Sequence, residues 1–214
     1  MKTMLSLFTL LFISLQVSAQ ETTAPAAPEK KEKGSAYGIT AGLLTPTGDY
    51  GKTYGVTPHI GLRLKTPVGG FFGLFSDIPN FHNDVFISYG LSSFSDDYKK
   101  SYKNGIGFGK EPDDADAGNA LTVVNTFRYT FTNMLPLFDP YAGVGVGVSY
   151  VLGGNLASTV SSLGSFGYGF ALKGGVQMPL TDWFAIDASA DYLIGSYSFF
   201  NLGVSAMFTF GGKY

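Results

Sequence analysis

Apolar side chains recur at every second position in eight separate segments of this chain. The segments span residues 37–43, 60–65, 85–91, 121–131, 142–150, 166–178, 184–192 and 200–210. A period of two is typical of β-strands that present one apolar face. Their number is even, and each approaches the roughly ten residues that cross a bilayer as a tilted strand. The pattern therefore predicts an all-β fold, an eight-stranded antiparallel transmembrane β-barrel.

The charged residues within these segments all lie on the face opposite the apolar stripe. They are Arg63, Lys65, Arg128, Lys173, Asp187 and Asp191. A membrane barrel requires this placement, because outward charges would meet lipid. A soluble β-sandwich is the alternative, but its polar face would meet water, and here that face is mostly Gly, Ser, Thr and Ala. Phe86, Val124 and Met207 are apolar exceptions on the polar face.

The first 35 residues differ from the rest of the chain. Lys2, an apolar stretch over 4–15 and the small residues Val17 and Ala19 are typical of a secretory signal peptide over residues 1–19. A retained N-terminal anchor is the alternative. Residues 20–35 are rich in Pro and Ala and then in charge, which predicts a disordered periplasmic linker. The barrel domain is expected over 36–214.

The segments between the predicted strands fall into two classes. With the start of the barrel in the periplasm, the connections over 45–55, 92–119, 152–165 and 195–198 face outward. The periplasmic connections at 132–138 and 179–182 are suitably short. The connection over 66–83 is too long for a periplasmic turn, and either a short extra hairpin or a plug-like insertion would account for it.

The longest outward connection carries a dense set of charges. They are Asp96, Asp97, Lys99, Lys100, Lys103, Lys110, Glu111, Asp113, Asp114 and Asp116. This composition predicts a water-facing surface loop. Because rigid scaffolds commonly carry function on their loops, it is the expected contact surface for other cells, phage or host molecules. Alternatively, it only shields the barrel.

Composition narrows the function classes further. Charged residues make up 14% of the chain, aromatic residues 15%, and there is no cysteine, so disulfides, thiolate metal sites and cysteine nucleophiles are excluded. The formal charge of −2 argues against nucleic-acid binding. Many aromatic residues stand near the ends of the predicted strands, as expected of the interfacial girdles of a membrane barrel.

Candidate catalytic, cofactor and metal residues are sparse. The two histidines are His59, expected in the lumen near the outer rim, and His82, expected in a periplasmic connection. Residues 105–110 superficially suggest a phosphate loop, but the spacing is wrong. Asp113, Asp114 and Asp116 lack the later Gly and Glu of a calcium loop. No catalytic residue, cofactor or metal is therefore predicted.

The run Tyr141–Gly147, the later Gly174–Gln177 and the strand Ile186–Tyr192 together resemble the small outer-membrane β-barrel family, which includes OmpA-type, OmpX-type and OmpW-type barrels. The resemblance extends from about Tyr37 to the C-terminus. It implies the outer membrane of a Gram-negative-type bacterium, contact with outer-membrane lipid, and assembly by the insertion machinery that reads a C-terminal aromatic signal. It implies no shared catalytic motif.

Three functions follow from this interpretation. The first is a non-enzymatic, monomeric outer-membrane protein with a structural or surface-interaction role and a largely filled lumen. The second is a narrow channel for small solutes, favoured by lumenal glycines such as Gly147 and Gly167. The third is a lipid A-modifying enzyme, in which His59 with Ser92 or Asp96 would imitate a palmitoyltransferase site.

The lumenal charges carry a specific prediction. Arg63, Arg128, Lys173, Asp187 and Asp191 are expected to form an ion-pair network that obstructs the lumen, since unpaired charges inside a low-dielectric wall are costly. A turn at Leu180 and Thr181 would bring Lys173 opposite residues 187–189 and pair it with Asp187. The alternative is two separate, solvated charges.

Overall fold

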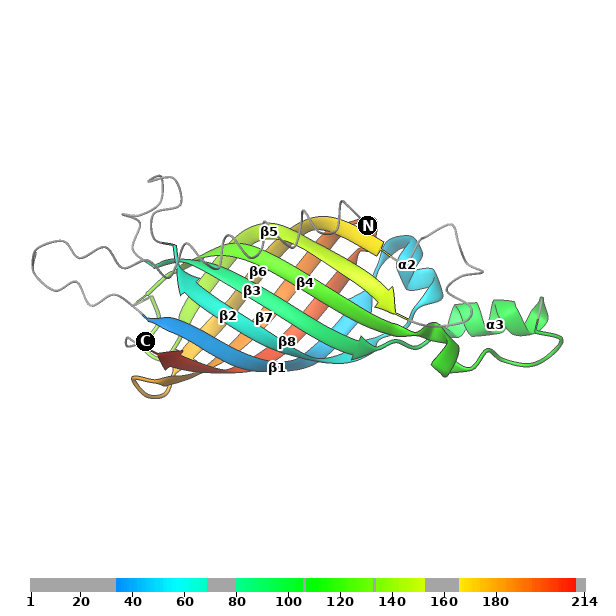
Figure 1. Cartoon of the computed structure of the whole chain (residues 1–214), viewed down its shortest axis with the longest axis horizontal. Helices are drawn as coiled ribbons and strands as arrows, with labels where there is room; N and C mark the ends of the chain where they lie inside the picture. Colours follow the sequence, from blue (N-terminus) through cyan, green and yellow to red (C-terminus); the bar gives the residue numbers. More distant parts are fainter. Residues whose placement is uncertain (1–33, 69–79, 106, 133, 153–165, 211–214) are drawn as a thin grey trace, which may run out of the picture.

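The structure, a computed structural model, describes residues 34–68, 80–105, 107–132, 134–152 and 166–210. Eight antiparallel strands form a closed barrel, in which each strand pairs with its sequence neighbours and β1 pairs with β8 (Figure 1). This confirms the predicted fold class. The strands are β1 (Ser35–Pro46), β2 (Thr57–Pro67), β3 (Phe81–Leu91), β4 (Asn119–Thr130), β5 (Asp139–Leu152), β6 (Phe166–Pro179), β7 (Phe184–Gly195) and β8 (Phe199–Phe210).

The alternation of side chains decides what fills the barrel and what covers it. In β2, Ile60 and Leu62 are more than half exposed on the outer wall, whereas Arg63 is 3% exposed inside. The six charges predicted on the inner face are all buried. The three apolar exceptions, Phe86, Val124 and Met207, are buried inside as well and belong to lumenal apolar clusters.

Aromatic pairs cover the outer wall at the barrel end where β1 begins and β8 finishes, which we call the terminus end. Tyr37 packs on Phe210 with ring centroids 5.4 Å apart, and Tyr129 packs on Phe131 at 5.1 Å. Phe208 packs against both Phe184 and Trp183. Such a ring of aromatic side chains is typical of a membrane–water interface.

The opposite end, which we call the loop end, carries helices. The predicted 45–55 connection contains α2 (Gly48–Thr53), and the 92–119 connection contains α3 (Asp96–Asn104) and the 3-10 helix η2 (Asp114–Ala117). These helices were not predicted, because the period-two pattern carries no information on the connections. Ser95 caps α3 by accepting a hydrogen bond from the Tyr98 backbone N–H at 3.2 Å, and Asp96 and Asp97 occupy its first turn.

The strand limits correct one further prediction. Strand β2 continues to Pro67 and β3 begins at Phe81, so His82 lies within a strand rather than in the predicted 66–83 connection. The predicted signal peptide, nearly all of the linker, residues 69–79 of the predicted 66–83 connection, most of the 152–165 connection and Tyr214 lie outside the described residues. None of the helices in the described ranges is long and apolar enough to cross a membrane.

Candidate functional site

The centre of the lumen holds a cluster of two carboxylates and two guanidinium groups. Asp84 of β3 accepts hydrogen bonds from Arg63 Nε at 2.9 Å and from Arg63 Nη2 at 2.7 Å. Arg128 of β4 donates through Nη1 to Asp84 Oδ2 at 3.2 Å and to Asp187 Oδ2 at 3.0 Å. Arg63 Nη1 also contacts Asp187 Oδ1. These four side chains come from four strands and close the middle of the barrel.

Tyr141 of β5 completes this central cluster. Its hydroxyl donates to Asp187 Oδ1 at 2.6 Å and accepts from Arg63 Nη2 at 3.0 Å. The Arg128 guanidinium lies 3.8 Å from the centre of its ring, a cation–π contact. Towards the terminus end, Gln177 accepts from both Arg128 Nη2 at 2.6 Å and Lys65 Nζ at 2.9 Å.

A second arm of the network runs towards the loop end. Lys173 Nζ lies 3.4 Å from Asp84 Oδ2 and 3.2 Å from Asp191 Oδ1. Asn201 donates to Asp191 Oδ2 at 3.0 Å and shares a 2.7 Å hydrogen bond with His59 Nε2. The polar contacts are therefore continuous from His59 to Lys65, across most of the lumen.

The structure brings together all five residues of the predicted lumenal network but corrects one pairing. Lys173 lies opposite Asp191, and Asp187 lies opposite Gln177. The predicted Lys173–Asp187 pair is therefore wrong. The reason is the turn: Pro179 pairs with Ala185, so the connection between β6 and β7 is centred later than residues 180 and 181.

Two central members of the network, Asp84 and Tyr141, were not predicted from the sequence. Asp84 is fully buried and contacts Arg63, Arg128 and Lys173. The predicted third strand began at Val85, and extending its alternation by one residue would have placed Asp84 inside. Tyr141 stands two residues before Gly143 and therefore lies on the same inward face of the strand. Nothing in the sequence indicated that the Tyr141 hydroxyl would reach Asp187.

Apolar layers lie on both sides of the polar network. The layer nearest the terminus end contains Ala36, Ala185 and Met207. The layer on the loop-end side contains Leu44, Phe86, Val124, Ala171, Leu193 and Phe199. Beyond it, buried residues of the connections and strand ends form what we call the aromatic cap: Tyr50, Tyr54, Phe94, Ala117, Val151 and Tyr197, with Tyr98 packed against them.

The lumenal glycines accommodate these layers. A Cβ atom on Gly147 would lie 2.8 Å from Leu193 Cδ1, and one on Gly167 would overlap the ring of Tyr197. A Cβ on Gly61 would lie 2.8 Å from Phe86 Cε2. The space that glycine leaves at these positions is filled by large side chains, which weakens the argument that they open a channel.

Burial in the aromatic cap changes the acidity of its phenols. The ring of Tyr50 packs at a tilt against both Tyr54 and Tyr197, with ring-centroid distances of 4.5 Å. Burial, with Tyr197 and Tyr98 nearby, raises the pKa of Tyr54 to about 12. The pKa of Tyr50 is raised further for the same reason. Both phenols are therefore neutral at physiological pH, which suits a packed cap.

Helix α3 and the turn after it, residues 96–111, form what we call the hairpin. Helix α3 projects farther from the strands of the barrel than α2 does (Figure 1). No residue of α3 is buried. Lys99 Nζ bonds Asp114 Oδ2 at 2.8 Å, and Lys103 Nζ bonds Glu111 Oε1 at 3.2 Å. The remaining charged residues predicted for this surface are exposed where their side chains are described: Asp96, Asp97, Lys100, Lys110 and Asp113. The side chain of Asp116 lies outside the described part.

Asp114 has a structural role that the sequence did not show. It accepts a hydrogen bond from the Phe94 backbone N–H at 2.9 Å and so connects the hairpin to the aromatic cap. Partial burial works against its charge, but the bonds from Lys99 and Phe94 dominate and hold the pKa of Asp114 below its ordinary value. The bond to Asp114 raises the pKa of Lys99.

The described residues offer little of the geometry that catalysis requires. His59 bonds Asn201 inside the lumen, and within the described ranges it has no hydrogen bond to Ser92 or Asp96. No group of three or more His, Cys, Asp or Glu side chains in these ranges is arranged to hold a metal ion. His82 is buried, and its Nδ1 lies 3.0 Å from the Asn80 carbonyl oxygen.

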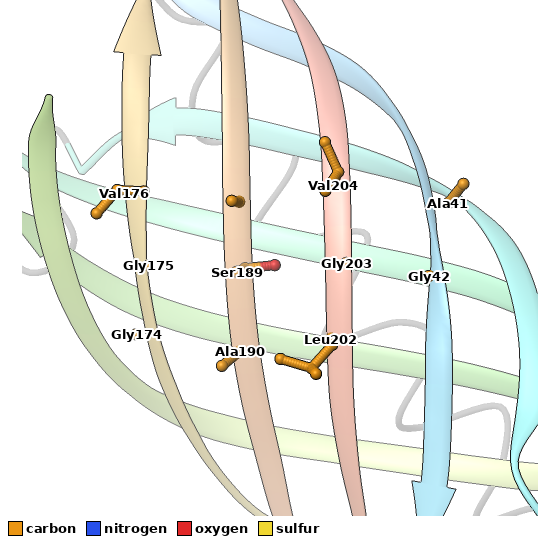
Figure 2. Close-up of a pocket in the computed structure, with 11 residues that line it drawn as sticks. Ala41, Gly42, Gly174, Gly175, Val176, Ser189, Ala190, Leu202, Gly203 and Val204 are labelled. Atoms are coloured by element: carbon orange, nitrogen blue, oxygen red, sulfur yellow. The ribbon is translucent and has the colours of Figure 1, made fainter. Parts of the chain in front are cut away.

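A shallow depression of about 500 Å³ crosses β6, β7, β8 and β1 (Figure 2). Its lining includes Gly174, Ala188, Ala190, Leu202 and Val204, and the polar side chain among the lining residues is Ser189. None of the lining residues is titratable. The depression therefore lacks the acids and bases that a lipid-modifying enzyme would need.

Comparison with known proteins gave matches among solved structures. No protein-family model matches the chain, and no curated protein sequence matches it. The N-terminal β-barrel domain of OprF from Pseudomonas aeruginosa is 13% identical with a TM-score of 0.48, covering 85% of this chain and 100% of that domain. Neisserial surface protein A is 14% identical with a TM-score of 0.48, covering 82% and 97%.

A further match is the Yersinia pestis outer membrane protein Ail in a phospholipid bilayer nanodisc, 15% identical with a TM-score of 0.44, covering 83% of this chain and 100% of Ail. These structural neighbours are small outer-membrane β-barrels. At such low identity the likeness concerns the fold alone. This chain is itself a closed barrel of eight antiparallel strands.

Proposed function

We propose that this protein is a non-enzymatic barrel of the outer membrane whose filled lumen supports an interaction surface at the loop end. The outer wall supports the membrane location. Ile39 is 57% exposed, Leu62 64% and Phe170 70%. A continuous apolar wall of this kind is stable in lipid, where a closed barrel also satisfies the backbone hydrogen bonds.

The observation that carries this proposal is the obstruction of the lumen. Arg63, Asp84, Arg128 and Asp187 contact one another across the middle of the barrel and are all at most 3% exposed. Apolar layers and the aromatic cap lie beyond them. The described side chains therefore fill the lumen, and the aromatic cap supports the connections that contribute to it.

Single-channel recording tests the filled lumen. The refolded barrel is inserted into planar bilayers, and insertion is verified by different gel mobility before and after boiling. We expect no stable open level. A narrow channel is the second candidate function, because the centre of the lumen is polar. Asp187→Ala removes a carboxylate that both Arg63 and Arg128 contact. If the protein is a channel, this variant should have a higher conductance than the unmodified protein. A stable open level in the unmodified protein would overturn the filled-lumen proposal.

Replacement of residues 99–116, which include most of the hairpin and the Asp114 contact with the cap, tests the interaction surface. Residues 99–116 are exchanged for a short Gly/Ser segment, and the barrel should still assemble, because loop length affects stability only weakly. Binding of cells that carry the protein to host cells or phage should fall. A variant that assembles and binds as before would show that the hairpin only shields the barrel.

A further inference from the structure

The tip of the hairpin holds an aromatic side chain in the open. Phe108 is 96% exposed. It stands in a turn closed by the hydrogen bond from the Lys110 N–H to the Gly107 carbonyl at 2.9 Å. Both central residues of this turn have positive φ, 48° at Phe108 and 84° at Gly109. Positive φ is unfavourable for a bulky residue, so this turn holds Phe108 outward at a conformational cost.

The turn is anchored to α3 by further backbone contacts. The Gly107 N–H donates to the Tyr102 carbonyl at 2.8 Å, and the Gly109 N–H donates to the Lys103 carbonyl at 3.0 Å. Gly107 lies close to the Tyr102 ring, since a Cβ atom on Gly107 would be 2.7 Å from Tyr102 Cδ1. The backbone that carries Phe108 is thus held by hydrogen bonds before binding, which lowers the entropy cost of docking.

Charge is segregated along the same hairpin. Residues 99–110 contain four lysines and no acidic residue, whereas Asp96 and Asp97 precede them and Glu111 follows. Lys99 and Lys103 are paired with Asp114 and Glu111. Lys100 and Lys110 are exposed and form no ion pair within the described ranges. Lys110, two residues after Phe108, therefore places unpaired positive charge beside the exposed ring, while the exposed Asp96, Asp97 and Asp113 lie outside residues 99–110.

We propose that this tip docks on the surface of an anionic lipid bilayer that faces the loop end. The proposal deepens the interaction role above and rests on it. An exposed aromatic ring on a hairpin with unpaired lysines matches the interfacial zone of such a bilayer, where the ring enters the headgroup boundary and the ammonium groups meet lipid phosphates. Because α3 projects farther from the strands of the barrel than α2 does, the bilayer is a second one rather than that of the barrel (Figure 1).

Flotation with lipid vesicles tests the proposal. The refolded barrel in nanodiscs is mixed with vesicles of phosphatidylcholine, with or without phosphatidylglycerol. We expect binding to the anionic vesicles that weakens as salt rises. Phe108→Ser should weaken it about tenfold, and Lys100→Gln and Lys110→Gln about fivefold each. Matched controls are Met134→Ser, an exposed apolar residue at the terminus end, and Lys52→Gln, an exposed lysine of α2.

Fluorescence provides a direct readout of insertion. Phe108→Trp in a Trp183→Phe background should shift its emission to the blue when anionic vesicles are added, whereas the same protein with phosphatidylcholine alone should not shift. Absence of vesicle binding by the unmodified protein overturns the lipid proposal. Binding that Phe108→Ser leaves unchanged, or equal binding to neutral vesicles, also overturns it. Each of these results leaves the filled lumen, tested by conductance, unaffected.

Discussion

Asp84 contacts three cations of the lumenal network, more than any other carboxylate that the structure describes. It contacts Arg63, Arg128 and Lys173 and is fully buried. Removing a carboxylate from such a cluster leaves several cations without a counter-charge in a low-dielectric interior. The sequence places Asp84 on the inward phase, but its three partners come from three other strands, so its importance depends on barrel closure.

We therefore expect Asp84→Asn to destabilise the barrel strongly, by about 3–5 kcal/mol. The measurement is urea unfolding of the barrel refolded in lipid, followed by tryptophan fluorescence. Asp97→Asn, an exposed carboxylate of α3, is the control and should change stability by less than about 0.5 kcal/mol. Equal effects of the two substitutions would contradict the central role of Asp84.

Two neighbouring glycines of β6 provide a second test at the residue scale. A Cβ on Gly175 would overlap the Tyr141 hydroxyl and the Ala188 carbonyl, whereas one on Gly174 would meet its nearest atom at 3.9 Å. We expect Gly175→Ala to lower the free energy of unfolding by about 1–3 kcal/mol. Gly174→Ala should have little effect. Similar unfolding midpoints for the two variants would show that the Tyr141 ring yields easily.

At the scale of elements, the helices and connections of the loop end converge on the aromatic cap. Tyr50 comes from α2, Tyr197 from the turn between β7 and β8, and Phe94 from the segment before α3. Their rings contact in series from Tyr197 through Tyr50 and Tyr54 to Phe94. The cap therefore joins three connections that are far apart in the sequence.

The raised pKa of Tyr54 gives the cap a defined alkaline limit. The folded cap favours the protonated phenol of Tyr54. The contribution of this phenol to the free energy of unfolding is therefore complete below about pH 10 and is lost as the pH rises through about 12. We expect the cap to loosen over this range, seen as rising phenolate absorbance and faster proteolysis at the loop end. Tyr54→Phe should reduce the phenolate change, and an unchanged titration would contradict the assignment.

At the scale of the whole molecule, the outer wall determines where the protein is stable. Apolar side chains cover that wall, and the closed sheet leaves no free edge among the described strands. We expect the chain refolded in detergent to show strong β circular dichroism and different gel mobility before and after boiling. A soluble monomer that folds without detergent would contradict the membrane barrel.

The sequence by itself determined the number of strands and which face each side chain takes. That information is local, because a period of two assigns every residue to one face whatever the strand pairs with. It was sufficient to place Arg63, Arg128, Lys173, Asp187 and Asp191 inside the barrel. It also placed the densest charges in the connection over 92–119.

Only the tertiary structure decided which of these side chains meet. The pairing of Lys173 with Asp191 depends on the register of β6 and β7, and a small shift of the turn centre changes the partner while keeping every side chain on its face. Closure then brings Asp84 and Asp187, from β3 and β7, to the same two arginines. The aromatic cap and the exposed Phe108 likewise depend on packing and backbone conformation, which no periodicity records.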